Sequence, residues 1–147
     1  MRTQIMYDRR LDNLLKRKHV IAGECALFRR LLIKEYTGKV QIYIALDEEA
    51  PANIDFLETY KSTFAEDFSY TSVYKRVENI LRPSAERAIV ECILNTECFV
   101  TPAILEAISC YLSTSSDVKL LYEVAEYFKL PAETLNSWLK EGKNFRR

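Results

Sequence analysis

Two neighbouring segments of this chain are apolar nearly all the way round, and they constrain the fold more than any other feature. Residues 85–96 read AERAIVECILNT, and residues 102–112 read PAILEAISCYL. A helix with so little polar surface must be enclosed by other parts of the protein. We therefore expect residues 84–112 to form a core helical hairpin, with the rest of the chain packed around it.

The N-terminal part, residues 1–39, predicts a long basic helix. The alternating 3-and-4 spacing of a coiled-coil seam runs from Leu11 to Leu32 and includes Lys18 and Cys25. The seam residues assigned to self-association are Leu11, Leu14, Ile21, Phe28 and Leu32. A continuous helix of this kind would run about 50 Å and would favour a homodimer. A break at Gly23, giving an antiparallel pair within a monomer, is the alternative.

Residues 40–83 form an acidic middle segment. Residues 40–46 alternate in a way that argues for a strand, but no second strand is evident to pair with it. Pairing with a second copy, or a helical or extended conformation, both stay open. Amphipathic spacing predicts helices over about 54–67 and 71–81. The expected fold is one all-α domain over residues 1–147, with about six helices around the core hairpin.

The net charge is zero, but the charges are unevenly distributed. Residues 1–39 hold ten Lys or Arg and four Asp or Glu, a local charge of +6. Residues 40–79 hold three and eight, a local charge of −5. The basic part could bind phosphates. Pairing with the acidic segment, in the same fold or in a second copy, is the favoured interpretation.

Catalysis and metal binding find little support in the sequence. His19 is the only histidine and is expected on a solvated helix face, so a Ser or Cys nucleophile has no evident base. The glycine motifs that bind phosphates are missing. The four cysteines form no C-x-x-C pair, which indicates free thiols in a reducing, cytoplasmic compartment. With no run of about 18 apolar residues, we expect a non-enzymatic protein without cofactor, metal or membrane span.

The C-terminal segment, residues 117–143, contains YEVAEYFKLPAETLNSWLKEGK and predicts two amphipathic helices joined by a tight turn. This stretch resembles the helix-turn-helix superfamily, in particular its excisionase-like and MerR-like DNA-binding modules. The matching positions are Val124 and Ala125 in the first helix, Leu130 after the turn, and Thr134, Leu135 and Trp138 in the second helix. Two positions depart from the pattern. Lys129 stands where glycine is usual, because that position needs a positive φ, and Glu133 would repel phosphates.

The resemblance implies a DNA-binding regulator whose second helix enters the major groove of double-stranded DNA. The residues expected to approach base edges are Glu133, Thr134, Asn136 and Ser137, and an asparagine can pair with adenine through two hydrogen bonds. The residues expected at phosphates are Lys129, Lys140, Lys143, Arg146 and Arg147, with the basic N-terminal helix as a second clamp. The alternative function is an all-α protein-interaction module, an adaptor or inhibitor that binds an unidentified protein and no nucleic acid.

Overall fold

The computed structural model describes residues 2–36, 38–74, 76–114 and 117–145, with the side chains described from residue 6 onward. The order of elements is α1 (Arg2–Leu14), β1 (His19–Val20), α2 (Gly23–Arg29), β2 (Val40–Ile44), β3 (Leu57–Lys61), the 3₁₀ helix η1 (Thr63–Glu66), β4 (Thr71–Tyr74), β5 (Val77–Pro83), α3 (Ala85–Leu94), α4 (Thr101–Thr114), α5 (Val118–Tyr127) and α6 (Ala132–Lys143). The protein is therefore a mixed α/β fold, and the expected all-α class is wrong.

The strands form two small sheets that meet at one residue. In the first sheet β5 lies between β1, which runs parallel to it, and β4, which runs antiparallel. In the second sheet β2 and β3 are parallel. Ile21 joins them through a bridge to Ile42, and the Ala22 N–H donates to the Gln41 carbonyl at 2.8 Å. The spatial order is thus β3-β2-β1-β5-β4, with a strand from the N-terminal part in the middle.

The middle segment shows where the helical predictions were wrong. Residues 40–46 do contain a strand, and its partner is β3 of the same chain rather than a second copy. The helix expected over 54–67 is β3 followed by η1, and the helix expected over 71–81 is β4 and the start of β5. These segments contain β-branched and aromatic residues that suit a sheet, and contacts with distant strands override the helical spacing of their apolar positions.

The long N-terminal helix does not form, and neither does its coiled-coil seam. Its residues are divided among α1, β1, α2 and the segment after α2, so neither the continuous helix nor the antiparallel pair is present. Leu11, Ile21 and Leu32 are buried in the core and Phe28 packs against it, whereas Leu14 is 56% exposed. Most of the seam residues thus pack within one chain, so they do not form the coiled-coil interface expected for the homodimer.

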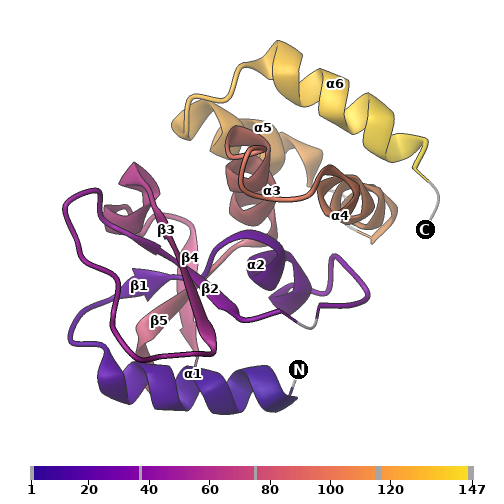
Figure 1. Cartoon of the computed structure of the whole chain (residues 1–147). Coiled ribbons are helices and arrows are strands. Elements are labelled where there is room, and N and C mark those ends of the chain that lie inside the picture. Colours follow the sequence, from indigo (N-terminus) through magenta and orange to yellow (C-terminus); the bar gives the residue numbers. More distant parts are fainter. Residues whose placement is uncertain (1, 37, 75, 115–116, 146–147) are drawn as a thin grey trace.

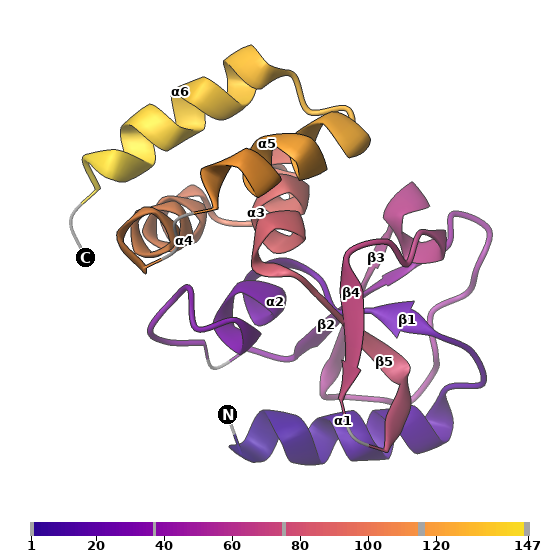
Figure 2. The same ribbon diagram turned by 180° about the vertical axis from the view of Figure 1, so that it is seen from behind.

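Where the core helical hairpin is expected, over residues 84–112, the structure has the two helices α3 and α4. The Ser84 hydroxyl accepts from the Arg87 N–H at 3.1 Å and caps α3, and Ile89, Val90, Ile104 and Ile108 are fully buried. Figure 1 shows α3 leading from the sheet into a helical layer made of α4, α5 and α6, while α1 covers the opposite end of the molecule. The view from behind shows the same separation (Figure 2). Because α1 and α6 lie at opposite ends, α1 is not a second clamp beside α6.

Candidate nucleic-acid interface

The turn between α5 and α6 has a residue with a positive φ, Lys129, at the position where the helix-turn-helix pattern usually has glycine. The Leu130 N–H donates to the Ala125 carbonyl at 2.8 Å, and the Lys129 N–H donates to the Glu126 carbonyl at 3.1 Å. This pair of bonds is a Schellman motif, which ends a helix with one residue in the left-handed region. Lys129 is that residue, with φ at 63°. Lys129 therefore adopts the left-handed backbone conformation that glycine usually adopts at this position, and its Cβ makes that conformation strained.

The apolar side of α6 fixes the helix against the rest of the protein. Leu130 and Leu135 are buried, and Trp138 and Leu139 are partly buried against the core. Gly142 faces α4 so closely that an added Cβ would lie 2.2 Å from Ile108 Cγ2. Apolar residues at this spacing leave the opposite side of α6 to solvent.

The residues predicted to approach base edges all lie on the exposed side of α6: Glu133, Thr134, Asn136 and Ser137. Among the predicted phosphate contacts, Lys129, Lys140 and Lys143 are exposed, whereas Arg146 and Arg147 lie outside the described residues. Asn136 is already engaged, because its Oδ1 accepts a hydrogen bond from the Tyr122 hydroxyl. To form two hydrogen bonds with adenine, Oδ1 must either use its second lone pair or exchange this donor for the base.

The charge on this surface is balanced rather than basic. The exposed cations of α5, the turn and α6 are Lys119, Lys129, Lys140 and Lys143, and the exposed carboxylates of the two helices are Glu123, Glu126, Glu133 and Glu141. Phosphate attraction at this surface is consequently small, and contacts with base edges would have to supply most of the affinity.

His19 forms a buried charged cluster that the sequence did not indicate. It is expected on a solvated helix, but β1 places it in the interior, only 2% exposed. Its Nε2 lies 2.8 Å from Glu48 Oε2, and its Nδ1 lies 2.9 Å from the Arg17 carbonyl. Both partners are acceptors, so both ring nitrogens are hydrogen-bonded only when both carry a proton.

Glu48 is the centre of this cluster and borders a cavity of about 300 Å³. Its burial acts to raise the pKa of the carboxyl, but hydrogen bonds from His19, the Ala45 N–H and Arg17 lower that pKa to about 2. The favoured pairing between basic and acidic segments is therefore present for Arg17 and His19 with Glu48. The buried pair of Arg29 and Asp8, by contrast, lies wholly within the basic segment.

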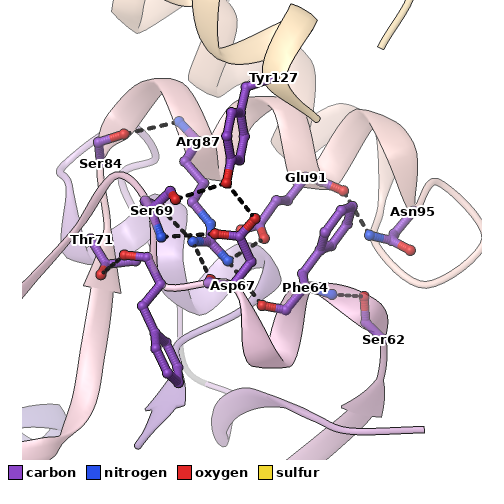
Figure 3. Close-up of polar contacts among 11 residues, drawn as sticks. Ser62, Phe64, Asp67, Ser69, Thr71, Ser84, Arg87, Glu91, Asn95 and Tyr127 are labelled. Atoms are coloured by element: carbon purple, nitrogen blue, oxygen red, sulfur yellow. Dashed lines mark hydrogen bonds and ion pairs between the residues drawn. The ribbon is translucent and has the colours of Figure 1, made fainter. Parts of the chain in front are cut away.

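A second buried cluster lies where the sheet meets the helical layer (Figure 3). Arg87 of α3 donates to the carbonyls of Asp67 at 2.7 Å and Ser69 at 2.6 Å, both in the loop between η1 and β4. It also lies 3.0 Å from the Glu91 carboxylate, one helical turn away. The Tyr127 hydroxyl of α5 contacts Ser69 Oγ and Asp67 Oδ2, each at 2.9 Å. The cluster joins α3, α5 and the loop between η1 and β4. In the sequence, the signal for it was the pair of opposite charges at Arg87 and Glu91, one helical turn apart in a segment expected to be buried on all sides.

The described residues hold no group of three or more His, Cys, Asp or Glu side chains arranged to bind a metal ion. Cys25, Cys92 and Cys110 are buried free thiols, and Cys98 is an exposed one. Within the described ranges, every helix is too short or too polar to cross a membrane. Comparison with models of known protein families and with curated proteins finds no match.

Proposed function

We propose that this protein binds double-stranded DNA through the exposed side of α6. The observation that supports the proposal is the combination of the Schellman turn at Lys129 with an outward face that carries Asn136 and Lys140. The second helix of a helix-turn-helix must be held firmly from behind and left open in front. Leu135 and Gly142 hold α6 from behind, because both are buried against the neighbouring helices.

Specificity in this proposal comes from Asn136. Its amide is the best match to an adenine edge among the exposed residues of α6, since it offers one acceptor and one donor side by side. The Tyr122 hydroxyl holds Oδ1 in the free protein and thereby orients the amide. Binding exchanges that hydrogen bond for one from the base.

The test is a titration of duplex DNA with the wild type and two variants at several salt concentrations. Asn136→Ala should lose about 1–3 kcal/mol of discrimination between preferred and random duplexes. Lys140→Ala should weaken binding to every sequence alike and reduce the salt slope by about one unit. Neither change should alter the melting temperature, because both side chains are exposed.

Two further variants make the test specific to this surface. Tyr122→Phe removes the donor that engages Asn136 Oδ1, so it should change discrimination without changing the salt slope. Lys61→Ala removes an exposed charge on β3, in the sheet region of the molecule, and should have no effect. Wild-type protein that shows no salt-dependent binding, or an equal loss from Lys61→Ala, would contradict the proposal.

Protein interaction is the second candidate, and the open edge of the sheet at β4 favours it. β4 pairs only with β5, so no described strand covers its outer side. Val73 and Tyr74 on β4, Phe68 just before it and Tyr127 of α5 all expose large apolar surfaces. Such an edge accepts an extended segment through backbone hydrogen bonds. A second copy of the chain can supply that segment through its own β4.

Sedimentation at micromolar concentrations tests this second candidate. A dimer that Val73→Lys dissociates would support pairing at β4, because a lysine on an edge strand opposes edge-to-edge association. Leu14→Lys, which places the same charge on the exposed side of α1, is the matched control. A wild-type monomer would rule out this form of protein interaction.

A further inference from the structure

The outward face of α1 and the loop after it form a basic surface. The exposed charged side chains over residues 6–18 are all cations: Arg9, Arg10, Lys16, Arg17 and Lys18. The two carboxylates of this stretch are used elsewhere. Asp8 is buried in a bidentate ion pair with Arg29, and Asp12 accepts from the backbone N–H of Asn79 at 2.6 Å. The fold thus places the acids of α1 toward the protein and its bases toward solvent.

Most of these cations are not neutralised by a neighbour. Arg17 pairs with Glu48, but within the described part of the chain Arg9, Arg10, Lys16 and Lys18 make no ion pair. Met6, Arg9, Arg10 and Asn13 follow 3-and-4 spacing and share the outer side of the helix. Arg9 and Arg10 therefore point outward from α1, and Lys16, Arg17 and Lys18 continue the basic surface in the loop after it.

A cleft of about 590 Å³ adjoins this face, and its walls carry Arg10, one further cation, Lys39, and one carboxylate, Asp55. Its lining consists of Tyr7, Arg10, Gly38, Lys39, Asp55 and Phe56. The Arg10 guanidinium lies over the ring of the buried Phe56, 4.9 Å from its centroid, and Tyr7 stacks on the same ring at 4.7 Å. Arg10 is thereby held in a fixed position at the cleft, which lowers the entropic cost of binding an anion there.

The chemistry of this surface fits a chain of phosphates better than a lipid bilayer. Insertion into a membrane surface requires a continuous apolar face. On the outer side of α1 the large exposed apolar residues are Met6 and Leu14, and they are separated by two helical turns. The cations here, two on α1 and three in the loop after it, instead match the repeated charges of a nucleic-acid backbone.

We propose that the outer face of α1, with the cleft at Arg10 and Lys39, is a second nucleic-acid surface that binds the phosphate backbone of a duplex without reading its sequence. Arg10 and Lys39 bind phosphate at the cleft, and Arg9, Lys16 and Lys18 contact the phosphates that follow. This surface lies at the end of the molecule opposite α6 (Figures 1 and 2), so it acts independently of the proposed DNA reading by α6.

The test compares two triple variants of equal charge in a titration with a 20-base-pair duplex of random sequence. Arg9→Gln/Arg10→Gln/Lys16→Gln removes three cations from the α1 face. Lys34→Gln/Lys61→Gln/Thr63→Glu changes three exposed positions outside both proposed surfaces and gives the same net charge. We expect the α1 variant to lose at least tenfold in affinity at low salt and about three units of salt slope. The control variant should bind like the wild type.

Each outcome separates this proposal from that for α6. A loss on changing Lys140 alone, with the α1 variant unaffected, would overturn the α1 surface and keep the α6 surface. Equal losses in both triple variants would show that only net charge matters and would overturn it too. Vesicles containing anionic lipid serve as a second probe, and binding to them without binding to the duplex would assign α1 to a membrane surface instead. Absence of duplex binding by the wild type contradicts both nucleic-acid proposals.

Discussion

Arg87 places a full positive charge in the interior, with no part of its side chain exposed to solvent. Besides the carbonyls of Asp67 and Ser69, it donates to the Phe64 carbonyl at 3.1 Å and lies over the Phe128 ring. These contacts replace the water that the guanidinium loses on burial at its two terminal nitrogens, whereas Nε has no hydrogen-bond partner among the described residues. They also mean that Arg87 does not depend on the Glu91 carboxylate alone, which leaves Glu91 able to take up a proton.

The protonation of Glu91 predicts how stability depends on pH. Complete burial raises the pKa of its carboxyl from 4.5 to about 7, although Arg87 acts in the opposite direction. Between these two values the folded protein binds more protons than the unfolded chain, so the free energy of unfolding falls as pH rises through that window. The fall should approach about 1.4 kcal/mol per pH unit. Denaturant titrations from pH 4.5 to 8 measure it.

Glu91→Gln is the variant that isolates this effect, because glutamine does not titrate. The stability of the wild type relative to this variant should decrease from pH 4.5 to 7 and then level off. Glu97→Gln, at an exposed position just after α3, should leave the pH profile of the wild type unchanged. A wild-type profile parallel to that of Glu91→Gln would show that Glu91 is already ionised in the folded protein.

For single residues, local sequence patterns predicted well which side chains face solvent, and they predicted poorly which polar side chains are buried. The spacing of Leu135, Trp138 and Leu139 was sufficient to place Asn136 and Lys140 on the exposed side of α6. The burial of His19 depends on β1, which in turn depends on strands far along the chain. No pattern within residues 16–19 contains that information.

Among the elements, α4 and α6 can pack closely because Gly142 has only a hydrogen atom as its side chain. A Cβ at Gly142 would lie 2.2 Å from Ile108 Cγ2 and 2.7 Å from Ile108 Cβ, distances that require a shift of the helices. Gly142→Ala should therefore lower the free energy of unfolding by about 1–3 kcal/mol through overpacking. This loss opposes the gain of about 1 kcal/mol that alanine brings to a helix interior.

Ser137→Ala is the matched control for this prediction, because Ser137 lies on the exposed side of the same helix. It should be neutral or slightly stabilising, as intrinsic helix propensity dictates. Chemical denaturation of the two variants beside the wild type makes the comparison. A stabilised Gly142→Ala protein would mean that α6 does not pack on α4 at this point.

The elements that were predicted correctly are those whose signal is local. α3 to α6 follow apolar spacing, a signal that lies within each helix. β3, β4 and β5 are short, and their stability comes from partners that the sequence does not indicate. Leu57, Tyr60 and Phe64 show why: their 3-and-4 spacing suits a helix, yet they belong to β3 and η1.

In the whole molecule, β1 connects the two sheets although it is the shortest strand. Val20 is fully buried there and pairs with Leu81, while the next residue bridges to β2. Val20→Asp would place a carboxylate without a partner at this junction, so it should destabilise the protein by several kcal/mol, beyond the usual range of about 0.5–3 kcal/mol for point mutations.

Hydrogen exchange shows whether that effect reaches the whole sheet. In Val20→Asp the amides of both β3 and β4, the two outer strands, should lose protection together. Lys18→Asp, two residues earlier and exposed, should retain the protection seen in the wild type. Loss of protection in β4 alone would indicate that the two sheets unfold separately.

The position of β1 also has a consequence for synthesis of the protein on the ribosome. His19 pairs with Ile80, so the first strand to emerge must wait for some sixty further residues before its neighbour exists. At translation rates of about 5–20 residues per second, that interval lasts about 3–12 s. Throughout it Val20 and Ile21 lack the strand that covers them, and the nascent chain exposes β-prone apolar segments. Chaperones that bind such segments should therefore associate with this protein while it is being made and release it once β5 has left the exit tunnel.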